Sequence, residues 1–231
     1  MSTSVAQGQR RGRGGRRIAL LVVAAVAVAV IAAVVVWAFP VFKVSTIEVT
    51  GNERVSEEAV WELTGVPEGE NLLRVDTVAA ASGVVSDPWV SAATVTRQLP
   101  STLKVELQER TVVAYRDGDD GTVLIDSEGT PFIVEPPPEG AVLVAGDAAD
   151  DERVLSGAVD IAAAIPAEVR EQVAALEAES PRSYTFVLHD GRRVHWGAST
   201  DNANKALAME TVLLREGSEW DVSNPELVTV R

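Results

Sequence analysis

Residues that could carry out catalysis or bind a metal ion are few in this chain, and their spacing fits no known site. Cysteine is absent, and His189 and His195 are the only histidines. Zinc usually takes several histidine or cysteine ligands, so the composition argues against zinc and excludes thiol catalysis. The sequence has no G-x-S-x-G turn, no phosphate-binding loop and no dinucleotide-binding glycine motif. We therefore expect no catalytic residue, cofactor, metal or small-molecule substrate, and we do not expect an enzyme.

One loop has part of a calcium-binding pattern. Asp117, Asp119 and Glu128 stand at the first, third and twelfth positions of such a loop. Gly121 and Thr122, however, stand where the fifth ligand and the sharp glycine turn are required. The flanking segments also read as strands and not as helices. A β-hairpin turn is therefore the better prediction.

The last residues of the chain could act through their backbone. Leu227–Arg231 is rich in β-forming residues, is apolar at Val228 and Val230, and contains no lysine. A strand at the edge of a sheet has unpaired N–H and C=O groups, and a partner strand can add to them. From the residues alone, an ordinary edge strand and a docking edge both remain open.

A long apolar segment near the N-terminus predicts a membrane anchor. All 22 residues from Ile18 to Phe39 are apolar. As a helix rising about 1.5 Å per residue, the segment would span a hydrocarbon core of about 30 Å. Residues 1–17 contain five arginines and no acid, which predicts a cytoplasmic N-terminus and an extracytoplasmic C-terminal part. A cleaved signal peptide is the alternative, but its apolar region is usually only about 7–15 residues long.

The charge distribution narrows the class of partner. The formal net charge is −14, and five of the 20 basic side chains lie in the first 17 residues. The remaining 15 basic side chains face 34 acidic ones. Nucleic acids and anionic lipids need a basic surface, so we expect the extracytoplasmic part to bind neither.

The residues after the anchor predict a small α+β unit. Val44–Val49 alternates as a strand, and Ser56 is a good N-cap for a helix that ends at Gly65. Asp76 caps a second helix that reaches about Ser86. Two strands follow, Val90–Gln98 and Thr102–Arg110. The predicted order is strand, helix, helix, strand, strand, with both helices on one face of a small sheet.

The rest of the chain predicts a mixed β domain with flanking helices. The predicted strands are Val112–Tyr115, Val123–Asp126, Val173–Glu179, Tyr184–His189, Arg192–Trp196 and the terminal segment. The predicted helices are Asp150–Ile165, a short turn after Pro166, and Asp201–Arg215. The fold class is therefore α+β.

An ordered series of residues resembles a known family. In the first unit the matching residues are Phe42, Val44, Ile47, Val49, Gly51, Asn52, Val55, Ser56, Gly69, Asn71, Leu72, Leu73, Val75, Asp76, Pro88, Val90, Ala93, Val95, Arg97, Pro100, Leu103, Val105, Leu107, Glu109 and Arg110. In the second they are Ile125, Asp126, Gly129, Gly191, Val194, Gly197, Lys205, Asp221, Val222, Ser223, Pro225 and Arg231. The layout resembles the FtsQ/DivIB family of bitopic bacterial cell-division proteins.

This resemblance implies a domain layout and a set of partners. The domains are a cytoplasmic basic tail (1–17), a transmembrane helix (18–39), a POTRA domain (42–110) and an FtsQ-type β domain (111–231). Proteins of this family are scaffolds of the divisome at the division septum. They bind FtsB, with FtsL beside it, and help control septal peptidoglycan synthesis, and their POTRA domain contacts other septal proteins.

Carried over to this chain, the resemblance assigns the partner-binding residues. They are Leu227, Val228, Thr229, Val230 and Arg231, with Lys205 of the last helix in support. Arg231 would pair with an acid on the partner. A membrane-anchored POTRA chaperone or assembly factor for exported proteins is the alternative function. A single POTRA domain with no barrel after it argues against that alternative.

Overall fold

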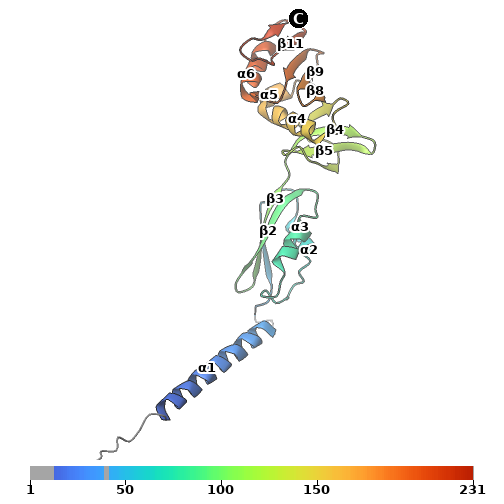
Figure 1. Cartoon of the computed structure of the whole chain (residues 1–231). Helices are drawn as coiled ribbons and strands as arrows, with labels where there is room; N and C mark the ends of the chain where they lie inside the picture. The colour runs from blue at the N-terminus through green and yellow to red at the C-terminus, as the bar shows by residue number, and fades with distance from the viewer. Residues whose placement is uncertain (1–12, 39–41, 231) are drawn as a thin grey trace, which may run out of the picture. The chain divides into compact units, whose positions relative to one another are not determined.

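The computed structural model describes residues 13–38 and 42–230, which divide into two compact units, the first of which includes the N-terminal helix (Figure 1). The first unit comprises Met1–Ser86 with Ala93–Leu107, and the second comprises Asp87–Ala92 with Gln108–Arg231. Most of the predicted basic tail, Phe39 and Arg231 lie outside the described residues.

Helix α1 spans Arg13–Ala38 and contains most of the long apolar segment. Its described side chains, at position 18 and at positions 20–35, are all exposed. Among the residues that the structure describes, no helix has both the length and the hydropathy that crossing a membrane requires. The membrane anchor stays a prediction.

The first unit has the predicted order of elements. Its elements are β1 (Thr46–Thr50), α2 (Glu57–Thr64), α3 (Thr77–Val84), β2 (Val90–Gln98) and β3 (Thr102–Glu109). The sheet order is β1-β3-β2, and β1 pairs with β3 in parallel. The predicted helix signals act as expected, because the Ser56 hydroxyl accepts a hydrogen bond from the Ala59 N–H at 3.2 Å and Gly65 adopts the left-handed conformation.

The second unit is built on one long mixed sheet. Its strands are β4 (Val112–Gly118), β5 (Gly121–Asp126), β6 (Pro131–Val134), β7 (Val142–Ala145), β8 (Val173–Ser180), β9 (Ser183–Leu188), β10 (Arg193–Gly197), β11 (Glu219–Asp221) and β12 (Thr229–Val230). Its helices are α4 (Glu152–Ala164), α5 (Ala167–Arg170) and α6 (Asn202–Leu213). The nine strands lie in the order β12-β11-β10-β9-β8-β7-β4-β5-β6.

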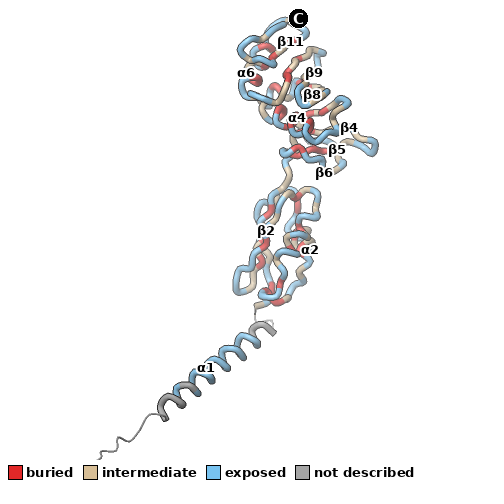
Figure 2. Tube along the Cα trace, in the orientation of Figure 1, coloured by how far each residue is buried: buried red, intermediate tan, exposed pale blue. Residues whose placement is uncertain are grey.

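Helices connect two of the three parallel pairs of this sheet, and the third pair, β4 with β7, is connected through β5 and β6. Strand β7 pairs in parallel with β8 across α4 and α5, and β10 pairs in parallel with β11 across α6. Parallel neighbours need such crossovers, and the crossover helices then cover a face of the sheet. The two longer helices contact each other, and both contribute to one apolar core that includes Phe186, Trp196 and Met209. Strands β7 and β9 alternate between buried and half-buried positions, and Figure 2 colours the chain by this burial.

The structure adds three short strands to those expected. Strands β6, β7 and β11 have four, four and three residues, too few to display an alternating pattern. The loop at Asp117–Gly121 is the tight connection of the β4–β5 hairpin, as predicted. Helix α4 begins after its N-cap Asp151, whose carboxylate accepts hydrogen bonds from the N–H groups of Arg153 and Val154. The helix therefore starts two residues later than the expected Asp150.

A buried carboxylate fixes the start of the second unit. Asp126 is 2% exposed and accepts hydrogen bonds from the N–H groups of Glu128 and Thr130, both at 2.9 Å. It also pairs with the guanidinium of Arg110, which lies over the Phe132 ring. The carboxylate therefore joins the end of β5 to the segment that follows β3.

We predict that Asp126→Ala lowers the free energy of unfolding of the second unit by about 3 kcal/mol. The substitution leaves the Arg110 guanidinium and the N–H groups of Glu128 and Thr130 without their acceptor. Chemical denaturation of the full chain measures this change. Asp119→Ala, at an exposed residue of the β4–β5 turn, is the matched control. Equal effects of the two substitutions would refute a stabilising role for the Asp126 network.

Candidate partner-docking edge

The last strand lies at an edge of the nine-stranded sheet, as the sequence predicts. Strand β12 pairs antiparallel with β11, with Val230 opposite Trp220 and Thr229 opposite Asp221. On its other side no strand pairs with it among residues 13–38 and 42–230. One side of β12 therefore has backbone groups available for an added strand.

The side chains of the predicted docking residues differ in their surroundings. Leu227 is 68% exposed and Val230 is 52% exposed, while Val228 packs partly against the core. Exposed apolar side chains beside an open strand edge are what strand addition needs, because they give the incoming strand something to pack on. Arg231, the last residue predicted for this site, lies outside the described residues.

Trp220 and Gly217 support β12 from the helix-covered face. Trp220 is buried, and its indole N–H has no hydrogen-bond partner within the described part of the chain. A Cβ atom at Gly217 would lie 2.8 Å from both Val230 Cγ2 and Trp220 Cζ2. Only a glycine there allows the loop to approach the edge strand so closely.

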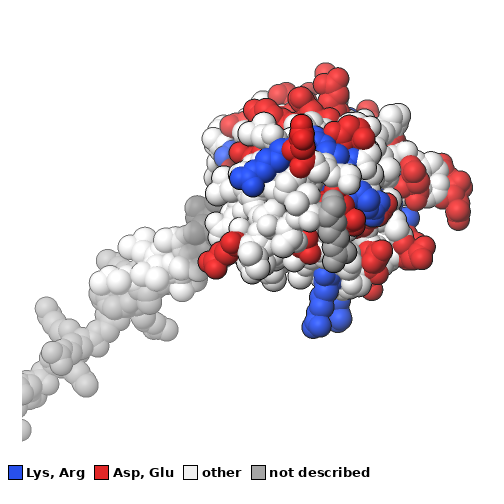
Figure 3. Space-filling model, turned by 90° about the horizontal axis from the view of Figure 1, so that it is seen from above, with Lys and Arg blue, Asp and Glu red and all other residues white. Residues whose placement is uncertain are grey.

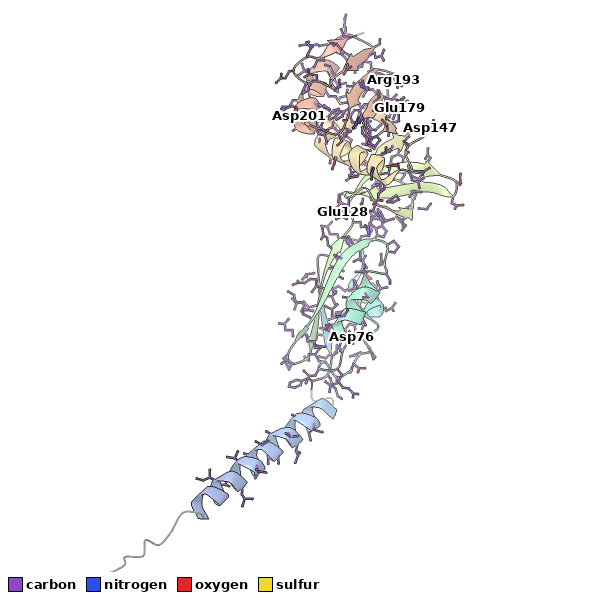
Figure 4. All side chains as sticks on the ribbon, in the orientation of Figure 1. Asp76, Glu128, Asp147, Glu179, Arg193 and Asp201 are labelled. Atoms are coloured by element: carbon purple, nitrogen blue, oxygen red, sulfur yellow. The ribbon has the colours of Figure 1, made fainter. Side chains whose placement is uncertain are left out.

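The opposite face of the sheet is polar and carries a row of directly paired residues. The row runs across five strands as Glu177, Thr185, His195, Asp221 and Thr229. The Thr185 hydroxyl lies 3.2 Å from His195 Nδ1. Figure 4 labels Arg193 and Glu179 on the strands of this sheet and Asp201 at the start of α6.

This polar face is hollowed next to the docking edge. A hollow of about 310 Å³ is lined by Thr185, Arg193, His195, Glu219, Trp220, Asp221 and Thr229. Arg193 donates to Glu177, with one nitrogen–oxygen distance of 3.2 Å and a second, shorter contact. That ion pair raises the pKa of Arg193, so its guanidinium stays charged and bound on the β8 side of the hollow.

Lys205 lies in the core and not on the surface of the edge. It is 2% exposed, and its ammonium donates to the Ala198 carbonyl at 2.9 Å and lies over the Trp196 ring. Burial lowers the pKa of Lys205, while the carboxylates of Asp201 and Asp221 oppose that effect. Lys205 can therefore support the edge by holding the loop between β10 and α6, while a direct contact with a partner would require it to leave the core.

The two histidines have different surroundings. His195 takes part in the polar row, whereas His189 follows the end of β9, where its N–H donates to the Gln172 carbonyl. Within the described residues, no group of three or more His, Cys, Asp or Glu side chains is placed to hold a metal ion.

Acidic side chains are more widely spread than basic ones across the face of the molecule seen in Figure 3.

Two domain families match the two units. Residues 42–110 match the FtsQ-type POTRA domain, and residues 113–219 match the C-terminal domain of cell division protein FtsQ/DivIB. The second match ends within β11, before the docking edge.

Relatives that match most of this chain carry the same description. The cell division protein FtsQ of Corynebacterium glutamicum is 42% identical over 93% of this chain and 98% of its own length. The FtsQ protein of Mycobacteroides abscessus is 38% identical over 98% of this chain and 74% of its own length. That of Mycolicibacterium smegmatis is 35% identical over 92% of this chain and 63% of its own length.

We predict that Lys205 makes the free energy of unfolding of the chain change with pH in the alkaline range. Because its pKa is lowered below 10.5 in the folded state, the unfolded state binds more protons between the folded pKa and 10.5. The free energy of unfolding therefore rises with pH in that window, and the gain is lost as the pH falls through the folded pKa. Denaturant unfolding of wild type and Lys205→Met, compared across this range, measures the contribution of Lys205. A pH dependence of the same slope in both proteins would contradict the prediction.

Proposed function

Because the chain belongs to the FtsQ/DivIB family of cell division proteins, we propose that it is a membrane-anchored scaffold of the divisome that acts by binding and not by catalysis. The observation that carries the proposal is the open edge at β12, beside exposed Leu227 and Val230. An edge of this kind binds another chain through the backbone, without reactive side chains.

The proposed partner is an FtsB-like protein, with an FtsL-like protein beside it. Its extracytoplasmic segment adds a strand to β12, so that the nine-stranded sheet gains a tenth strand. Main-chain hydrogen bonds supply affinity, and side chains alternating along the added strand supply specificity. Through this complex the chain helps to control septal peptidoglycan synthesis.

The proposed domain layout follows the predicted one. Residues 42–110 form a POTRA domain for contacts with other septal proteins, and residues 111–231 form the β domain that carries the docking edge. The match of residues 42–110 to the FtsQ-type POTRA domain supports the first assignment. The match of residues 113–219 to the FtsQ/DivIB C-terminal domain supports the second.

Helix α1 is the proposed membrane anchor, with residues 1–17 in the cytoplasm and the C-terminal units outside. The helix spans Arg13–Ala38, and its described side chains are exposed, large apolar ones among them. Exposed valine, leucine and isoleucine along a whole helix need an apolar environment, which a bilayer supplies. The arginines that precede the apolar segment support the orientation.

We predict that Val230→Asp weakens binding of the FtsB-like extracytoplasmic segment about 30-fold or more, because it places a charge where the added strand packs. The measurement is a binding titration with the full chain. Val134→Asp is a matched control, because Val134 is 50% exposed on β6 at the other edge of the same sheet.

Thr229→Pro tests the same edge through the backbone, since proline removes the N–H that faces Asp221 on β11 and so disturbs the pairing that holds β12 in place. Circular dichroism and thermal unfolding establish that each variant is folded. Wild-type affinity in both Val230→Asp and Thr229→Pro, with the fold intact, would show that β12 is not the docking edge.

We predict that an N-terminal fusion to a protein that fluoresces only in the cytoplasm forms a sharp fluorescent band at the constriction site. The arginine-rich tail keeps the fusion inside, and the divisome partners hold the chain at the septum. Microscopy of dividing cells at native expression gives the result. A dark fusion would contradict the orientation, and a uniform envelope signal in constricting cells would contradict septal recruitment.

A further inference from the structure

We infer that the strand added to β12 carries a lysine or arginine, and that this side chain reaches across Thr229 into the polar hollow beside Glu219. The inference rests on the proposed function, because the side chain must arrive on a strand paired with β12. It deepens that proposal by naming the chemistry that the partner presents. The observations that carry it are the paired row, the hollow and the distribution of charge around the hollow.

The paired row fixes where the partner's side chain points. Directly paired residues of a sheet share a face, so the partner residue beside Thr229 continues the row through Asp221 and His195. Neighbouring strands lie about 4.8 Å apart, which puts this residue about 10 Å from the backbone of β11. A long side chain bridges much of that distance, and the small side chain of Thr229 does not block it.

The charge beside the edge is negative. Glu219 and Asp221 both lie on β11, the strand next to β12, and both line the hollow. The Asp221 carboxylate accepts a hydrogen bond from the Ser223 N–H at 2.9 Å. Arg193, the basic side chain that lines the hollow, lies on β10 directly opposite Glu219. Its guanidinium is bound to Glu177 on β8, which is three strands farther from the edge than β11. A cation arriving from the β12 side thus meets carboxylates first.

The hollow suits a single charged side chain better than a small-molecule ligand. Its volume of about 310 Å³ is at the lower limit of small-molecule sites, which span about 300–1,000 Å³ and are mostly apolar. Here, apart from Trp220, the lining residues are threonine, histidine, arginine, aspartate and glutamate. Charge complementarity of this kind makes binding specific for one partner, whereas main-chain hydrogen bonds alone would bind almost any extended strand.

Titration of the full chain with the extracytoplasmic segment of the FtsB-like protein from the same bacterium tests this inference. We expect Glu219→Lys to weaken binding at least about fivefold, and Glu219→Gln to weaken it less. Glu168→Lys is the matched control, because Glu168 is exposed on α5, outside the hollow, and the net charge changes equally. Raising the salt concentration should reduce the difference in partner affinity between wild type and Glu219→Lys, because salt screens the charges.

Replacing the partner's lysine or arginine by glutamate completes the test. We expect that change to weaken binding to wild type and to restore binding to Glu219→Lys. Equal affinities for Glu219→Lys and Glu168→Lys, with binding still lost in Thr229→Pro, would overturn the inference and leave strand addition intact. Wild-type binding by both Glu219→Lys and Thr229→Pro would overturn strand addition itself.

Discussion

The long sheet is buried on one face and not on the other, and this difference determines the properties of the second unit. Helices α4 and α6 connect parallel neighbours, so they come to lie on the sheet and share a core with residues such as Phe186 and Trp196. The strands accordingly place apolar side chains toward the helices and polar ones toward the other face. The polar row, the hollow and the exposed side of β12 all follow from that arrangement, because nothing in the described chain covers them.

The end of the sheet is the point at which the fold remains open to another chain. A sheet in a soluble domain is usually protected at its edges by charge, proline or a covering loop. Strand β6, at one edge, begins with Pro131. Strand β12 is only two residues long, with exposed Val230 and with Leu227 just before it. Its shortness limits unwanted association, and a specific partner gains affinity by packing on these apolar side chains.

Much of this fold could be predicted from the sequence, for reasons visible at particular residues. Ser56, Gly65 and Asp76 mark helix ends through local hydrogen bonds, and such signals depend on neighbouring residues alone. The pairing of β11 between β10 and β12 could not be predicted, because a three-residue strand has no period and its place depends on contacts far apart in the sequence. The position of β12 at an edge was predicted. The polar hollow and the burial of Lys205 emerge only when distant strands and helices come together.

The claim that β12 receives a partner strand is tested most directly by amide hydrogen exchange of the full chain, with and without the FtsB-like extracytoplasmic segment. Backbone N–H groups that become hydrogen-bonded to an added strand exchange more slowly. The account predicts slowed exchange at Val230, whose N–H faces the open side because that of Thr229 faces Asp221 on β11. We expect slowing by about tenfold or more at saturating partner, while β6 at the opposite edge is unchanged. Unchanged exchange at β12 with partner bound, or protection at β6 instead, would contradict it.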